Sequence, residues 1–232
     1  MITVSKRMET VISMVMKGNK VADIGTDHGY VPIALIQRGI APQAIAMDVR
    51  KGPLQKAKEN RMAYQMEEKI EIRLSDGLQQ LKAGEVDTII IAGMGGELIA
   101  RILKEGETIV QSVKELIVQP QSEIYKVRKQ LHELGFQIVK EEMLIEEGKY
   151  YTVMKAVAGR QTYKDEVEYF YGKLLLEERN PILYQWLEKE YCTTKELYKK
   201  IEYVDSPAAI IRKEELLHTL ELIKGGIAYY ES

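Results

Sequence analysis

Hydrophobic positions in the first 160 residues alternate between short continuous runs and stretches with helical spacing. Continuous runs such as Thr88–Ala92 suit strands that are buried on both faces of a parallel sheet. The amphipathic stretches between the runs suit the helices that cover such a sheet. Strands are therefore predicted at residues 21–25, 44–49, 70–75, 86–92 and 116–119, and helices at residues 31–38, 53–64, 96–106 and 124–134.

Two extended runs follow Gly135, at residues 136–145 and 150–157, and the turn between them contains Gly148. Glycine readily takes the positive φ that tight hairpin turns need. Five parallel strands followed by an antiparallel hairpin are not expected of one half of a dinucleotide-binding Rossmann fold. Rossmann-like methyltransferases have this arrangement. The predicted fold class is α/β, a Rossmann-like class I methyltransferase whose mostly parallel seven-stranded sheet ends in an antiparallel hairpin.

Residues 161–232 show apolar positions at helical spacing and no strand pattern. Asn180-Pro181 interrupts the first helical stretch, and Ser206-Pro207 places a capping side chain before a proline at the first helical position. Thr193-x-x-Glu196 has the spacing of a capping box. Three or four helices are predicted, packed as an antiparallel bundle or a coiled-coil domain. The predicted domains are therefore residues 1–160, which bind a cofactor, and the helical residues 161–232.

Composition narrows the class of protein. No window holds the ~18 uncharged apolar residues of a membrane span, and the N-terminus lacks an apolar signal core. A cytoplasmic protein without membrane attachment is expected. The single cysteine, Cys192, excludes an internal disulfide and a multi-cysteine metal site. Net charge is −2, and residues 161–232 carry 10 Lys and Arg against 14 Asp and Glu. A polyanionic partner is therefore expected to meet the first domain, or a basic strip on the second.

The segment Asp23-x-Gly25-x-x-x-Gly29 joins the first predicted strand to a helix, where many nucleotide cofactors bind. Asp48 and Asp76 follow the next two strands, where carboxylates suit a ribose and an adenine amino group. Asp27, inside the loop, would repel a pyrophosphate, whereas S-adenosylmethionine has no phosphate and carries a sulfonium and an ammonium group. The pattern favours S-adenosylmethionine over a dinucleotide. In the alternative, these acids only cap helices or start turns.

Two further strand ends carry unusual residues. Gly93-Met94-Gly95-Gly96 follows the fourth predicted strand and leaves backbone bare where a ligand can lie. Gln119-Pro120-Gln121 follows the fifth strand, at the same edge of the sheet, and offers amide groups to a nucleobase. The alternatives are a glycine-rich helix entry required by close packing and a proline turn with solvated glutamines.

Five segments together resemble one family. The bacterial tRNA (adenine-N1)-methyltransferases known as TrmK, which modify adenine 22 in the D-arm region, are similar to this chain at Val21–Tyr30, Ala46–Leu54, Ser75–Gly77, Ile91–Gly96 and Gln119–Gln121. The helical tail also fits the coiled-coil domain of that family. The resemblance implies tRNA as the partner and S-adenosylmethionine as the methyl donor. The cofactor-binding residues expected on this basis are Asp23, Gly25, Thr26, Asp27, Gly29, Asp48, Val49, Ser75, Asp76, Gly77, Ala92, Gly93, Met94 and Gly95.

Adenine N1 has an in-plane lone pair that can attack a sulfonium methyl directly, but it is a weak nucleophile. A carboxylate that accepts a hydrogen bond from the exocyclic amine would compensate the positive charge that develops on the base. The hypothesis gives this catalytic role to Asp27 or His28, with Tyr30 as a stacking or hydrogen-bonding wall and Gln119 holding the base edge. In the alternative, Asp27 contacts only the amino-acid part of the cofactor, and His28 caps the following helix.

N1 lies on the pairing edge, so the target adenine must leave its stack at a cost of a few kcal/mol. Phosphate contacts are expected to supply that free energy. The candidate RNA-binding residues are Lys6, Arg7, Lys126, Arg128 and Lys129, and each of them also fits a solvated helix face.

No metal is expected, because His28, His132 and His218 lack the spacing of ligands. The expected state is a monomer. Two other functions remain open at this point. One is a small-molecule methyltransferase, which leaves the helical arm without a purpose. The other is a non-catalytic methyltransferase-like scaffold whose arm binds a protein.

Overall fold

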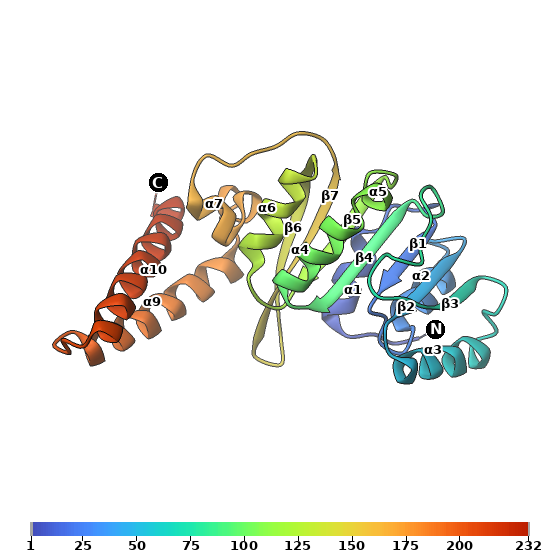
Figure 1. The fold of residues 1–232 in the computed structure, drawn as a ribbon, viewed down its shortest axis with the longest axis horizontal. Coiled ribbons are helices and arrows are strands. Elements are labelled where there is room, and N and C mark those ends of the chain that lie inside the picture. Colours follow the sequence, from blue (N-terminus) through green and yellow to red (C-terminus); the bar gives the residue numbers. More distant parts are fainter. Residues whose placement is uncertain (1, 232) are drawn as a thin grey trace. The chain divides into compact units, whose positions relative to one another are not determined.

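The computed structural model describes residues 2–231, which form two compact units that divide between Thr162 and Tyr163. The first unit contains a seven-stranded sheet with the order β3-β2-β1-β4-β5-β7-β6 (Figure 1). Its strands are β1 (Val21–Ile24), β2 (Ala44–Asp48), β3 (Ile70–Leu74), β4 (Thr88–Met94), β5 (Glu115–Pro120), β6 (Phe136–Glu146) and β7 (Lys149–Ala158). Strands β1 to β5 are parallel, whereas β7 is antiparallel to both β5 and β6. The predicted fold class is confirmed.

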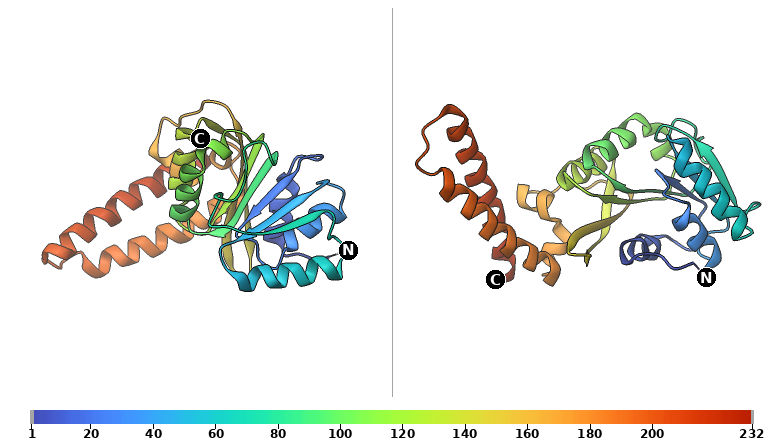
Figure 2. Two further views of the ribbon diagram at one scale, coloured as in Figure 1. Left: turned by 45° about the vertical axis from the view of Figure 1, so that its right-hand side comes forward. Right: turned by 90° about the horizontal axis from the view of Figure 1, so that it is seen from below.

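Helices cover both faces of this sheet. Those of the first unit are α1 (Lys6–Met14), α2 (Tyr30–Gln37), α3 (Lys51–Ala63), α4 (Gly96–Glu105), α5 (Glu107–Val110) and α6 (Ile124–Glu133). The chain adds β2 and β3 on one side of β1, and it adds β5 on the opposite side, next to β4. Because such crossovers are right-handed, α2 and α3 lie on one face of the sheet and α4 lies on the other. Helix α1 shares a hydrophobic core with α2, and α4 packs against α6 (Figure 2).

Strand burial explains why the continuous apolar runs form the centre of the sheet. All four residues of β1 and all five of β2 are buried, and Ile89, Ile90 and Ile91 of β4 are fully buried between the two helical layers. Strand β4 begins and ends two residues later than predicted, at Thr88 and Met94, and its register against β5 shifts between Ala92 and Met94. Such a bulge bends a strand and redirects its side chains.

The hairpin of β6 and β7 closes with a two-residue turn. Glu146 pairs with Lys149, and both residues between them, Glu147 and Gly148, have positive φ of 50° and 74°. Two consecutive residues in that region define a type I′ turn, whose twist matches that of the flanking strands. The positive φ predicted for Gly148 is confirmed.

The second unit is helical and contains α7 (Glu166–Tyr171), α8 (Lys173–Glu177), α9 (Pro181–Ile201) and α10 (Pro207–Glu231). Helices α9 and α10 pack against each other as a hairpin. Asn180 accepts hydrogen bonds from the backbone of residues 182 and 183, and Ser206 caps α10 through the amide of residue 209. The capping box predicted at Thr193-x-x-Glu196 is wrong, because both residues lie inside α9. Among residues 2–231, no helix has the length and apolar character needed to cross a membrane.

Candidate active site

The carboxyl ends of β1 to β4 enclose a cavity of about 300 Å³. It lies at the point where the strand order reverses between β1 and β4, which is the usual ligand site of an open α/β sheet. The lining residues are Ile24, Gly25, Asp48, Val49, Arg50, Ser75, Asp76, Gly77, Ala92, Gly93, Met94, Leu98, Arg101 and Ile102. A larger cavity of about 400 Å³ includes Val21, Ala44 and Ile70, the first residues of three strands. Residues from four of the five predicted motifs line the cavity of about 300 Å³, and Gln119–Gln121 contributes none.

Two glycines shape the floor of the cavity. Gly25 has a φ of 74°, and a Cβ at this position would collide with the Cε methyl of Met94. Gly93 has a φ of 79° and occupies the bulge of β4. Glycine backbone therefore lines the cavity at both positions, and the Met94 methyl group, which lies over Gly25, has to move aside for a ligand to reach the backbone there.

Buried acids lie beneath this floor. Asp23 on β1 is only 5% exposed, and burial, together with the negative charges of Asp27 and Asp48, raises its pKa to about 6. Asp48 ends β2, is also buried, and accepts a hydrogen bond from the Arg50 amide at 2.6 Å. Val49, next to Asp48, keeps 59% of its surface exposed in the cavity wall and offers an apolar face. Cations and hydroxyl donors suit this edge, whereas an added anion would be repelled.

The third wall follows β3. The Ser75 hydroxyl donates to the Gly77 carbonyl at 2.9 Å and accepts from the Gln80 amide at 3.2 Å, which closes a tight loop around Asp76. Gly77 has a φ of 53°, and a Cβ there would lie 3.1 Å from Ile102 on α4. Asp76 itself is exposed at the rim.

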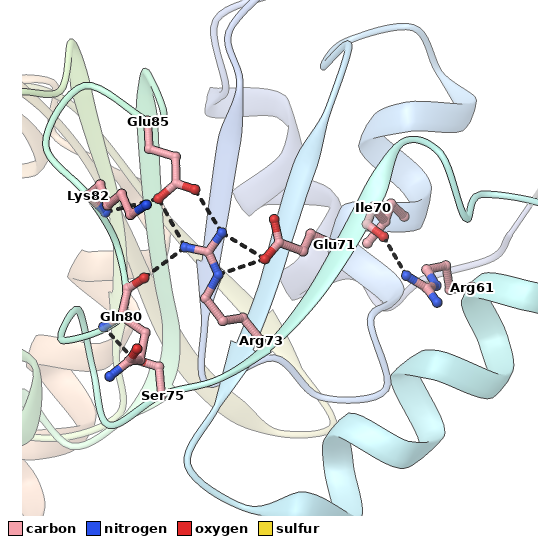
Figure 3. A network of polar contacts seen from close by, with 8 residues as sticks. All are labelled: Arg61, Ile70, Glu71, Arg73, Ser75, Gln80, Lys82 and Glu85. Carbon is pink, nitrogen blue, oxygen red and sulfur yellow. Dashed lines mark hydrogen bonds and ion pairs between the residues drawn. The ribbon is translucent and has the colours of Figure 1, made fainter.

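An arginine on β3 holds this wall in place. Arg73 donates to both carboxylate oxygens of Glu85 at 2.7 and 2.9 Å and to the Gln80 carbonyl at 2.8 Å, and it pairs with Glu71 at 2.7 Å (Figure 3). The Arg73 guanidinium lowers the pKa of Glu85 to about 2. The network fixes the segment from Ser75 to Glu85 against the sheet.

The turn before α2 lies beside the cavity rather than in its wall. His28 and Gly29 both have positive φ, of 59° and 71°, and Asn60 of α3 donates to the His28 carbonyl at 2.9 Å. His28 Nε2 lies 3.2 Å from Asp27 Oδ1, and its ring stacks on Tyr30 with centroids 5.4 Å apart. Asp27 is 70% exposed at its side chain. The three side chains form a polar and aromatic cluster that does not line the cavity: Asp27 is exposed, whereas His28 and Tyr30 are half-buried and Tyr30 packs against the core.

Gln119 has a different position from the one predicted. Its side chain is fully buried; Oε1 accepts from Arg7 Nη1 at 2.8 Å and from the Gly93 amide at 3.1 Å, and Nε2 donates to the Pro120 carbonyl at 2.9 Å. An amide group that is buried and engaged at both ends cannot hold the edge of a base. The structure therefore contradicts this role for Gln119 and leaves Gln121, which is exposed beside Gly93, at the rim.

Comparison with known proteins agrees with this geometry. Residues 4–154 match the family described as "Methyltransferase domain". A tRNA (adenine(22)-N(1))-methyltransferase of Bacillus subtilis is 34% identical over an alignment of 226 residues, which covers 95% of each chain. The chain belongs to the tRNA (adenine(22)-N1)-methyltransferase family. The crystal structure of the B. subtilis m1A22 tRNA methyltransferase TrmK superposes with a TM-score of 0.91 at 32% identity and covers 98% of this chain and 100% of that one.

A second solved structure adds a ligand. A Streptococcus pneumoniae protein, described as a candidate tRNA (m1A22) methyltransferase, was crystallised in complex with S-adenosyl-L-methionine. It is 37% identical, covers 97% of this chain and 99% of that one, and superposes with a TM-score of 0.85. The cavity of the present protein fits the same compound. Glycine backbone at Gly25 and Gly93 and the acids Asp23 and Asp48 suit a ligand with two cationic groups and no phosphate.

The basic residues predicted to bind RNA lie in different environments in the present structure. Lys6 and Lys129 are exposed, and Lys129 lies 5.5 Å from the Tyr125 ring. Lys126 is already paired with Glu97 and with Glu123. The assignment of Arg128 to RNA is wrong: its side chain is 1% exposed and pairs with the buried Glu141 at 2.8 Å. A charge that is desolvated in this way cannot meet a phosphate.

Nine of the fourteen residues predicted to bind the cofactor line the cavity; Asp23, Thr26, Asp27, Gly29 and Gly95 lie behind or beside it. The sequence-based prediction missed Ile24, Arg50, Leu98, Arg101 and Ile102. Leu98, Arg101 and Ile102 share one face of α4 through their spacing of three and four residues. That spacing, directly after the glycine segment, was an available signal. Among residues 2–231, no three His, Cys, Asp or Glu residues are grouped to hold a metal ion.

Proposed function

We propose that this protein transfers the methyl group of S-adenosylmethionine to N1 of adenine 22 in tRNA, as the name of its B. subtilis relative describes. The observation that carries the proposal is the separation between the cavity and the cluster of Asp27, His28 and Tyr30. A methyl donor needs an enclosed pocket, and an acceptor base needs a second surface that faces the pocket mouth and is open to a macromolecule.

The cavity residues account for donor binding. Asp48 and Asp76 are placed to accept hydrogen bonds from ribose hydroxyls and from an adenine amino group, and Val49 and Leu98 offer apolar surfaces to the adenine faces. Asp23 places a negative charge beneath Gly25 that attracts the cationic end of the ligand. When bound, S-adenosylmethionine supplies an electrophilic methyl group on a positively charged sulfur.

The cluster outside the cavity accounts for the acceptor. His28 and Tyr30 present stacked rings on which an extruded base can lie, and the Asp27 carboxylate is open to solvent and accepts hydrogen bonds. A carboxylate that binds the exocyclic amine stabilises the positive charge that the base acquires as N1 is methylated. Asp27 is therefore the proposed catalytic carboxylate, and His28 restrains it through the contact at 3.2 Å.

The RNA is proposed to contact Lys6 and Lys129, which are exposed cations of the first unit, and also Lys126, which must exchange its glutamate partners for phosphates. Cytoplasmic location follows from a tRNA substrate. The protein is proposed to act as a monomer, which sedimentation of the purified enzyme would check.

The experiment is transfer of labelled methyl from S-adenosylmethionine to two tRNA transcripts that differ only at position 22, one with adenine and the other with guanine. Nucleoside analysis of the first should yield N1-methyladenosine, and the second should remain unlabelled. Label in small molecules alone would support a small-molecule methyltransferase. Binding of S-adenosylmethionine without transfer to any acceptor would support a non-catalytic scaffold, and equal labelling of both transcripts would exclude position 22 as the target.

A further inference from the structure

The bulge of β4 leaves one backbone amide, that of Gly93, without a hydrogen-bond acceptor in the backbone of the sheet. Ala92 pairs with Gln119 and Met94 pairs with Pro120, so Gly93 has no partner residue on β5. The Gly93 amide instead donates to Gln119 Oε1 at 3.1 Å. A buried amide without an acceptor is costly, and the Gln119 side chain therefore keeps Gly93 in the conformation, with φ of 79°, that lines the cavity.

The Gln119 side chain is itself oriented by a residue far away in the sequence. Arg7, in the first turn of α1, donates from Nη1 to Gln119 Oε1 at 2.8 Å. A charged donor makes a stronger hydrogen bond than a neutral one, and the Nε2 bond to the Pro120 carbonyl prevents the amide from turning over. Arg7 thus fixes the one acceptor on which the Gly93 bulge depends.

Other contacts of Arg7 hold it at this point. Its guanidinium carbon lies 5.5 Å from the centroid of the Tyr151 ring, and its backbone amide donates to Glu146 Oε1 at 3.3 Å. A Cβ at Gly93 would lie 3.5 Å from Arg7 Nη1, so the guanidinium packs directly on the bulge. The guanidinium is linked to the rim through its hydrogen bond to the Gln119 amide.

We propose that Arg7 is a positioning residue, which acts through Gln119 to hold the Gly93 bulge in the shape that binds S-adenosylmethionine. Helix α1 is then part of the assembly of the cofactor site, although its residues do not line the cavity. The proposal deepens the proposed function, because it explains how that donor site is completed. It also gives Arg7 a role other than the phosphate contact predicted from its charge.

The test is a double-mutant cycle with Arg7→Met, Gln119→Met and the double variant. Binding of S-adenosylmethionine is measured by calorimetry without tRNA, well below the unfolding temperature of each variant. Each single variant should weaken binding about tenfold or more, which is the range expected when a part-buried hydrogen bond to a charged group is lost. The double variant should be no weaker than the worse single one, because both changes break the same chain of contacts. Arg7→Lys retains a donor and should restore part of the affinity.

Lys17→Met is the matched control, since it removes a cation from an exposed position just after α1 and should leave the affinity unchanged. Unchanged cofactor affinity in Arg7→Met, with a loss confined to tRNA binding, would overturn the proposal. Affinity losses that multiply in the double variant would also overturn it. If Arg7→Met does not fold, Arg7→Lys and its double variant with Gln119→Met complete the cycle. Because these measurements need no RNA, they remain informative if the protein proves not to methylate tRNA.

Discussion

The cofactor cavity and the acceptor side of the same sheet edge are built in different ways. The cavity is made mostly from short segments that follow β1, β2, β3 and β4, and each segment is shaped by its own glycine or by neighbours in sequence. Two parts of this edge depend on distant contacts instead: Arg7 contacts Gln119, the acceptor of the Gly93 amide in the cavity wall, across 112 positions, and Asn60 supports His28 on the acceptor side across 32. Local motifs therefore shape most of the donor cavity, whereas distant contacts hold the Gly93 bulge and the turn on the acceptor side.

The largest effect is expected at Gly25, in the part of the cofactor cavity that local motifs shape. In Gly25→Ala, the alanine backbone would have to keep a left-handed φ and the new methyl group would collide with Met94, so affinity for S-adenosylmethionine should fall about a hundredfold or more. The double variant Gly25→Ala with Met94→Ala removes the collision and should recover part of the loss, as measured by calorimetry. A Gly25→Ala protein that binds normally would show that the cavity does not depend on bare backbone here.

The acceptor side should respond in turnover rather than in cofactor binding. Asp27→Asn removes the carboxylate that is proposed to stabilise the charged base, and kcat on tRNA should fall about a hundredfold while the affinity for S-adenosylmethionine is retained. Asp76→Asn is the contrasting variant, because Asp76 lines the cavity and its loss should weaken cofactor binding first. If Asp27→Asn instead loses cofactor affinity at full kcat, the carboxylate only holds the donor.

This difference also explains what the sequence could and could not predict. The strands, the hairpin and the glycine loops follow from apolar runs and from turn residues, which act over short distances, whereas the order of the strands was not predicted. Gln119 and Arg128 were misplaced because burial depends on the whole fold: an amide or a guanidinium looks solvent-exposed in sequence until its distant partner, Arg7 or Glu141, is known. The network of Arg73 with Glu85 could not be foreseen for the same reason.

A smaller, pH-dependent effect tests whether Asp23 belongs to the donor side. Its pKa in the folded protein is about 6, above the ordinary value of 3.8. Between these values the folded state binds more protons than the unfolded state, so the free energy of unfolding should fall as pH rises from 3.8 to 6. A cationic ligand favours the ionised carboxylate, and the affinity for S-adenosylmethionine should therefore rise about tenfold from pH 5 to pH 7.

Calorimetric titrations at several pH values, together with unfolding curves of the free protein, measure both slopes. Asp23→Asn is the control, since it cannot ionise and should make the affinity nearly independent of pH in this range. The charges of Asp27 and Asp48 also face this carboxyl group, so Asp48→Asn should lower its pKa and move the transition to lower pH. A transition that persists unchanged in Asp23→Asn would assign it to another group.

The smallest effect is expected at Lys6, which lies next to Arg7 on α1 but is exposed. If Lys6 contacts a phosphate, Lys6→Met should weaken tRNA binding by a few-fold and lower the magnitude of the slope of log K against log salt by about 1. Cofactor affinity should not change, because Lys6 does not contact Gln119. The neighbouring Arg7→Met should show the reverse pattern, with cofactor affinity lost and the salt slope nearly retained. Two adjacent cations with opposite signatures would separate RNA contact from support of the cofactor site. Equal salt slopes in both variants and the wild type would remove α1 from the RNA-binding surface.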